Sequence, residues 1–113
     1  MSMVSIAEVQ DRIFKALADP SRRAIFEALA LRGGEAAVKD LTARFDISQP
    51  AVSQHLAALK DAGLVRGRRE GRCAYYRLEP RGMKPLIDWI AHYRAFWTEH
   101  ADRLEQLLER MDT

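Results

Sequence analysis

The sequence has one cysteine, Cys73, among its 113 residues, and it has no long uninterrupted hydrophobic run. A single thiol excludes an intramolecular disulfide framework and any metal cage built from cysteines alone within one chain. No apolar stretch approaches the roughly 18 residues that a membrane span needs, and residues 1–6 have no signal-peptide pattern. These absences predict a cytoplasmic protein with no membrane partner.

The chain is too short for two domains, and its net charge is small. Its 113 residues are 48% hydrophobic and 30% charged, which is typical of a folded globular protein, and we expect residues 1–113 to form one domain. The net charge of +2 is unevenly distributed, because residues 64–78 contain five arginines and one glutamate and so carry +4. A short basic segment of this kind favours an anionic partner.

Capping patterns and apolar spacing predict four helices in the first part of the chain. The first, second and fourth each have a polar N-cap before apolar residues at helical spacing, and the second and fourth have proline in their first turn. A shorter third helix is expected over residues 36–45. The expected N-caps are Ser5, Asp19 and Ser48, and the expected stops of the second and fourth helices are Gly33-Gly34 and Gly63.

Strands are expected only in one hairpin, over residues 64–69 and 73–78, with Gly71 in the turn between them. A connector with two prolines and a glycine then leads to a last helix over about residues 85–111. The predicted fold class is therefore mainly α with a β-hairpin wing, which is a winged helix-turn-helix.

The fourth helix has a polar face that does not suit a protein core. Val52, Leu56 and Leu59 must face the core, because they recur at helical spacing. Gln and Ser side chains elsewhere on the helix suit base edges in a DNA major groove, and the wing arginines suit phosphates or the neighbouring minor groove. The combination predicts binding to duplex DNA, although a polar face alone would also fit a solvated surface. Ala51, Gln54 and Ala58 point away from the core, with Gln49, Ser53 and His55 on the flanks.

The last helix has a coiled-coil-like seam of residues spaced three and four apart. This seam leaves more apolar surface than a small monomer can cover, so we expect a homodimer, with the first helix alongside. An aromatic effector pocket around Trp89, Tyr93 and Trp97 is the alternative. The seam contains His100 and Met111 and the expected dimerisation residues Leu86, Ile90, Tyr93, Trp97, Leu104 and Leu107.

The segment SQPAVSQHLAALKDAGLV followed by RREGRCAYYRL resembles the ArsR/SmtB family of bacterial winged-helix repressors, and the resemblance extends from LADPSRRAIFEAL to the last helix. It implies a homodimer formed through the first and last helices, whose recognition helices bind successive major grooves of a near-palindromic operator. The implied function is that of an autorepressor-type repressor of a bacterial operon. Carried over by position, the DNA-reading residues are Gln49, Ala51, Ser53, Gln54 and His55, with Arg68, Arg69 and Arg72 on the wing.

Two metal-binding patterns of that family are missing from this sequence. In the stretch that matches ELCVCDL, Ala37 and Lys39 occupy the cysteine positions. The pattern D-x-H-x10-E-x-x-H on the last helix has Ile90, Ala101 and Leu104 at three of its positions. Neither site can form with these residues, since none of them is a metal ligand of the required kind.

We therefore expect a regulator that binds no metal and no cofactor and does not respond to metals. A metal-responsive or redox-responsive member with a non-standard site stays open, with Cys73 and His100 as the residues in question. A sequence-tolerant, architectural DNA-binding protein is another alternative, and an unidentified small-molecule effector stays open as a partner. No enzyme is expected, because Ser53 and His55 point in different directions and no acid orients the imidazole.

Overall fold

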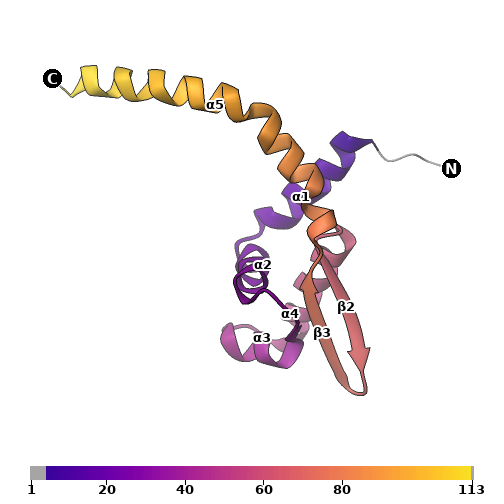
Figure 1. Cartoon of the computed structure of the whole chain (residues 1–113). Helices are drawn as coiled ribbons and strands as arrows, with labels where there is room; N and C mark the ends of the chain where they lie inside the picture. The colour runs from indigo at the N-terminus through magenta and orange to yellow at the C-terminus, as the bar shows by residue number, and fades with distance from the viewer. Residues whose placement is uncertain (1–4, 113) are drawn as a thin grey trace.

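The computed structural model describes residues 5–112, with the backbone alone at residue 95. Most of residues 1–6, which lack a signal-peptide pattern, and the last residue of the predicted domain lie outside this range. Figure 1 shows a body of short helices, a hairpin that projects from it, and a long final helix. The elements are α1 (Ile6–Ala18), α2 (Pro20–Arg32), β1 (Ala36–Ala37), α3 (Val38–Arg44), α4 (Gln49–Asp61), β2 (Val65–Glu70), β3 (Cys73–Leu78), the 3-10 helix η1 (Pro80–Met83) and α5 (Lys84–Met111).

The predicted helix starts are confirmed. At α1, α2 and α4 the N-cap side chain accepts a hydrogen bond from a backbone N–H three residues later, which satisfies a donor that the helix leaves free. Helix α2 ends at Gly33, whose φ of 72° is a left-handed conformation that glycine adopts without strain. The three cap bonds join Ser5 to Glu8, Asp19 to Arg22 and Ser48 to Ala51.

The sheet has three antiparallel strands in the order β1-β3-β2. The prediction that strands occur only in the hairpin was wrong, because Ala36 and Ala37 pair with Tyr76 and Tyr75 of β3. This pairing also delays the start of α3, predicted at residue 36, to Val38. Two alanines have no strand pattern of their own, so this strand forms only because β3 supplies its partner. The hairpin itself is confirmed: its first strand is shifted by one residue, and its second strand has the predicted bounds.

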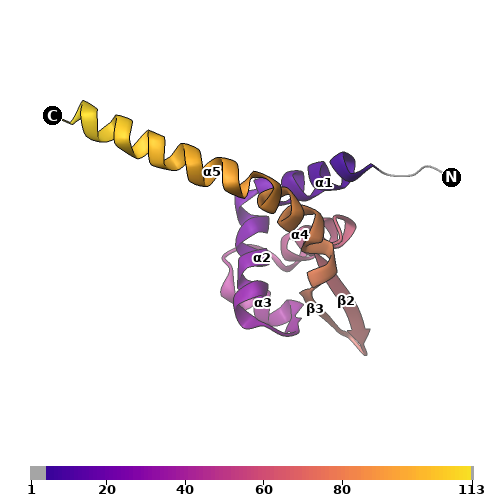
Figure 2. The ribbon, with the colours of Figure 1, turned by 45° about the horizontal axis from the view of Figure 1, so that its top comes forward.

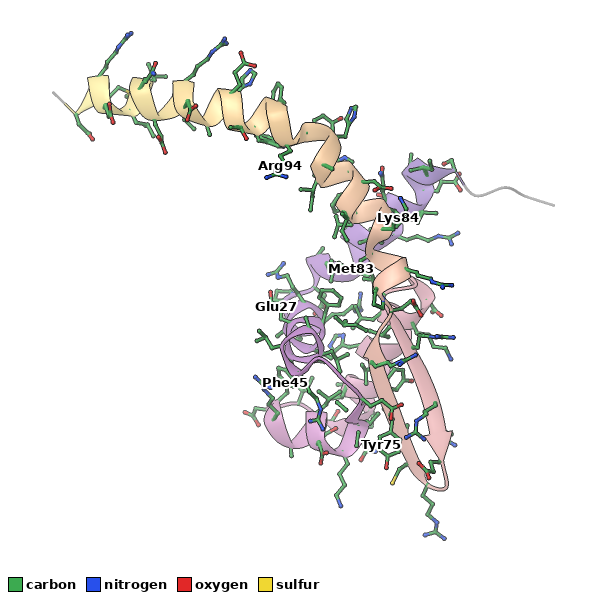
Figure 3. All side chains as sticks on the ribbon, in the orientation of Figure 1. Glu27, Phe45, Tyr75, Met83, Lys84 and Arg94 are labelled. Carbon is green, nitrogen blue, oxygen red and sulfur yellow. The ribbon has the colours of Figure 1, made fainter. Side chains whose placement is uncertain are left out.

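The core lies between the helices of the body and one face of the sheet, as the side chains in Figure 3 show. The prediction for α4 is confirmed, since Val52, Leu56 and Leu59 are fully buried. Each buried aliphatic side chain of this size contributes about 1.5–3 kcal/mol to stability. The other fully buried large side chains are Ile13, Ile25, Leu29 and Leu64.

A close backbone contact holds the start of α5 against the body. A Cβ on Gly82, in η1, would lie 1.5 Å from the carbonyl oxygen of Gly63, so only glycine fits. Nearby, the backbone N–H of Glu79 donates to the carbonyl of Leu64 at 2.9 Å. The segment that precedes α5 is therefore fixed to the turn after α4.

Helix α5 packs on α1 and then extends away from the body, as both views show (Figures 1 and 2). The ring of Trp89 contacts that of Phe14 edge-on, with centroids 5.2 Å apart. The radius of gyration is 18.1 Å, whereas a compact domain of this length has about 13 Å. None of the helices in the described range is long and apolar enough to cross a membrane.

Candidate nucleic-acid interface

The face of α4 that points away from the core carries exposed polar side chains. Gln49, Ser53 and Gln54 are exposed, as the sequence predicted. Their amide and hydroxyl groups donate and accept hydrogen bonds, and none of the three side chains is used in a bond within residues 5–112. This face is thus free to bind an external hydrogen-bonding partner.

Ala51 and His55 lie on a different side of α4, and both are half-buried. Ala58 is also half-buried, in a hollow that Arg22 of α2 helps to line. The Nδ1 atom of His55 is buried without a hydrogen-bond partner, and the imidazole contributes to the low pKa of Asp19, whose main cause is the N–H of Arg22. His55 therefore faces the start of α2 more than open solvent.

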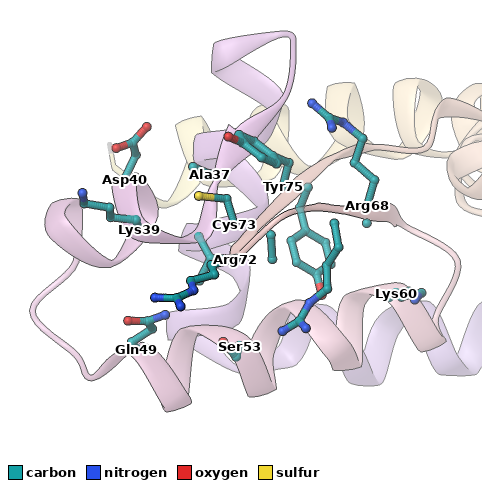
Figure 4. Close-up of a pocket in the computed structure, with 15 residues that line it drawn as sticks. Ala37, Lys39, Asp40, Gln49, Ser53, Lys60, Arg68, Arg72, Cys73 and Tyr75 are labelled. Atoms are coloured by element: carbon teal, nitrogen blue, oxygen red, sulfur yellow. The ribbon is translucent and has the colours of Figure 1, made fainter.

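A groove of about 780 Å³ separates α4 from the wing (Figure 4). When a recognition helix enters a DNA major groove, the adjacent phosphate strand passes between the helix and the wing. The groove has the charge that such a strand requires, because its lining includes several cations and a single acid, Asp40. The polar and charged residues that line it include Lys39, Asp40, Gln49, Ser53, Lys60, Arg68, Arg69 and Arg72, and of these Arg68 points its side chain away from α4 (Figure 4).

The three predicted wing arginines do not share one environment. Arg72, in the hairpin turn, points toward Gln49 in Figure 4. Neighbouring strand residues point to opposite faces, so Arg69 faces the groove while Arg68 lies on the outer face, beyond the strands from α4. Arg68 forms ion pairs with Glu35 and Glu70, whereas Arg69 and Arg72 form none within the described part of the chain.

Two basic groove residues were absent from the sequence prediction. Lys60 lies seven residues after Ser53 on α4, so helical spacing could have identified it as part of the same face. Lys39 comes from α3, and only the packing of α3 against the sheet brings it to the groove. The sequence contained a signal for Lys60 and none for Lys39.

Helix α5 exposes most of its predicted seam. Ile90, Trp97, Leu104 and Leu107 are between 52% and 57% exposed, and Tyr93 is 37% exposed. Leu86 differs, since it is half-buried and packs against the core of its own chain. An apolar stripe of this length is unusual on the surface of a monomer.

The described residues contain no cluster of three or more histidine, cysteine or acidic side chains suited to a metal. The two residues at the family's cysteine positions have other structural roles here. Ala37 belongs to β1 and pairs with β3, and Lys39 lines the groove. Cys73 is an exposed free thiol near the wing tip. The Nδ1 atom of His100 donates to the carbonyl of Phe96 at 2.8 Å, and the two rings stack.

Comparisons with known proteins agree with this geometry. The helix-turn-helix domain family matches residues 17–68. The transcriptional repressor SdpR of Bacillus subtilis is 35% identical over 83 residues, which cover 74% of this chain and 90% of SdpR. The HTH-type transcriptional regulator Rv2034 of Mycobacterium tuberculosis is 42% identical over 99 residues, 88% of each chain.

A solved structure of an ArsR family transcriptional regulator superposes with a TM-score of 0.72. It is 32% identical and covers 85% of this chain and 97% of its own. The winged helix-turn-helix fold and the DNA-binding, non-enzymatic character predicted from the sequence are thereby confirmed. With relatives of this identity and coverage, the chain belongs to the ArsR/SmtB family of DNA-binding transcriptional regulators.

Proposed function

We propose that the protein is a cytoplasmic homodimer that binds one near-palindromic operator and represses a bacterial operon as an autorepressor. The observation that carries this proposal is the groove between α4 and the wing, which has an exposed polar helix face on one wall and cations along its length. The polar wall suits base edges, and the cations suit the phosphate strand beside the same major groove. One docking geometry therefore uses both features.

Within this interface, Gln49, Ser53 and Gln54 read bases, since their exposed side chains can donate and accept together. Ala51 and His55 flank these positions on the half-buried side of α4. Arg69 and Arg72 bind phosphates from the wing side of the groove, and Lys39 and Lys60 add to the positive potential.

The proposed dimer forms through α5 and α1. The exposed seam of α5 is an apolar surface that a second copy would cover, with the same residues contributed by both subunits. Linking two recognition helices places two half-sites about one helical turn apart, and the joint binding is much tighter than that of one half-site. Operator affinity is therefore expected to depend on the dimer.

We propose further that metals do not regulate this protein. Lys39 places an ammonium group where related sensors have a thiolate, and this cation repels metal ions. Because Lys39 lines the groove, its ammonium group would also lie close to DNA phosphates. The inducing signal is then an unidentified small molecule, a change in protein level, or oxidation at Cys73.

The test is fluorescence anisotropy on two duplexes of about 30 base pairs, long enough for two half-sites. One is selected by the wild-type protein from random sequences, and the other has a scrambled sequence. Gln54→Ala should lose about 1–3 kcal/mol on the selected duplex and little on the scrambled one. Gln106→Ala, the same change on exposed α5, is the matched control and should bind both duplexes as the wild type does.

Salt titration separates phosphate contacts from base contacts. Arg72→Ala should weaken binding to both duplexes and lower the slope of log affinity against log salt by about 0.9 for each lost phosphate contact. Arg94→Ala on α5 is the control for a lost arginine. Equal affinity of the wild type for both duplexes would instead identify the sequence-tolerant alternative.

A further inference from the structure

The outer face of the wing contains an ion-pair cluster that the proposed DNA contacts do not use. We call Glu35, Arg68, Glu70 and Tyr75 the Arg68 cluster. The Nε and Nη2 atoms of Arg68 donate to the two carboxylate oxygens of Glu35 at 2.6 and 2.8 Å. Its Nη1 atom donates to Glu70 at 2.9 Å, and the guanidinium lies 4.6 Å from the ring centroid of Tyr75. All three nitrogen atoms of the guanidinium are thus occupied within the protein.

This cluster joins the wing to the body. Glu35 directly precedes β1, while Arg68 belongs to β2, and β3 lies between these two strands. The side chain of Arg68 therefore reaches across the whole sheet, over Tyr75, to hold a residue of the body. The same guanidinium also forms an ion pair with Glu70, which is the last residue of β2 before the hairpin turn.

At the far end of the hairpin Ala74 packs against the core, but residues 69–73 are exposed. Strand β1 pairs only with Tyr75 and Tyr76, so the backbone ladder to the body stops before the tip. Residues 69–74, which include Arg69 and Arg72, extend beyond that ladder. A two-stranded hairpin without further packing is marginally stable in water. The contacts of Arg68 are therefore well placed to restrict the angle of the tip.

We propose that Arg68 is a positioning residue: its bidentate bond to Glu35 fixes the angle of the wing so that Arg69 and Arg72 meet the phosphate strand. The assignment rests on the proposed function, because it concerns how the wing binds DNA. A bidentate arginine–carboxylate pair constrains geometry as well as charge. A wing that is held in its bound orientation loses less conformational freedom when DNA binds. The bond also holds the pKa of Glu35 below its usual range, so the pair stays ionised at neutral pH.

Glu35→Ala gives a test in which the two roles of Arg68 predict opposite signs. If Arg68 bound phosphate, removing the competing carboxylate would free the guanidinium and tighten DNA binding. If Arg68 positions the wing, the same change weakens binding to the selected duplex, by about fivefold for a pair of this exposure. Arg68→Ala should weaken binding to a similar extent and leave the salt slope unchanged, unlike Arg72→Ala.

Three controls accompany these variants. Arg66→Ala removes another arginine from the same face of β2, one that pairs with Glu79 at the base of the wing rather than with Glu35 across the sheet, and should have a smaller effect. Arg68→Lys keeps the charge and loses the bidentate geometry, so it should weaken binding as Arg68→Ala does. The swapped variant, Glu35→Arg with Arg68→Glu, restores the pair and should recover part of the affinity.

A readout without DNA completes the test. Backbone nitrogen relaxation in free Glu35→Ala should show increased motion in residues 69–74, with the melting temperature of the body unchanged. Wild-type affinity in Glu35→Ala, a reduced salt slope in Arg68→Ala, or an unchanged wing tip would each overturn the positioning role. A wild-type protein that binds no duplex would instead overturn the proposed function, and the positioning role with it.

Discussion

Replacing Trp97 with aspartate should dissociate the dimer, because the indole lies in the middle of the exposed α5 seam. Trp97 as a residue is 57% exposed. Since a packed aromatic side chain buries 150–250 Å², about 85–140 Å² of its surface remains for a partner. At about 25 cal/mol per Å², covering this surface contributes about 2–3.5 kcal/mol for each copy. A symmetric dimer covers it twice, hence about 4–7 kcal/mol, and losing 4 kcal/mol raises the dissociation constant about a thousandfold.

Sedimentation velocity over a range of protein concentrations measures this shift directly. Gln106→Asp adds the same charge on the opposite face of α5 and should sediment as the wild type does. Binding of the selected duplex should fall with dimer content in Trp97→Asp and stay unchanged in Gln106→Asp. The reasoning is refuted if the wild type is monomeric at micromolar concentration, or if Trp97→Asp remains dimeric wherever the wild type does.

Two further predictions concern the body and the metals. Gly82→Ala should destabilise the fold by about 1–3 kcal/mol in urea denaturation, because its Cβ would overlap the carbonyl of Gly63; Gly34→Ala, with open space around it, is the control. Stoichiometric Zn(II), Cd(II), Ni(II) or As(III) should leave the affinity for the selected duplex unchanged. A chelator-reversible loss of affinity that disappears in Cys73→Ser or His100→Ala would contradict this prediction and identify the ligand.

The helices could be predicted because their signals are local. A cap such as Ser48 and its bond to the N–H of Ala51 lie three residues apart, so the sequence contains both partners in one turn. Strand β1 could not be predicted on the same basis. Its two alanines have no strand preference, and the strand exists because Tyr75 and Tyr76, far along the chain, pair with it.

The site shows the same division between local and distant information. Helical spacing was sufficient to assign Ser53 and Gln54 to the exposed face of α4. It could not assign a partner to Arg68, because that partner, Glu35, lies 33 residues earlier and meets it only through the order of strands in the sheet. An arginine in a basic hairpin therefore looks available for DNA until the sheet is known.

The positive charge that the wing can present to DNA depends on this arrangement and not only on the number of arginines. The hairpin alternates its residues between two faces, and Arg66 and Arg68 lie on the outer face, where each is paired with a glutamate. Arg69 and Arg72 line the groove, and neither has an acidic partner within residues 5–112. Two phosphate contacts per wing, or four per dimer, would contribute about 3.6 to the salt slope, whereas contacts from all five arginines would contribute about 9. The loss of slope summed over alanine variants of the five arginines therefore distinguishes a wing that binds DNA with one face from a hairpin whose arginines all act alike.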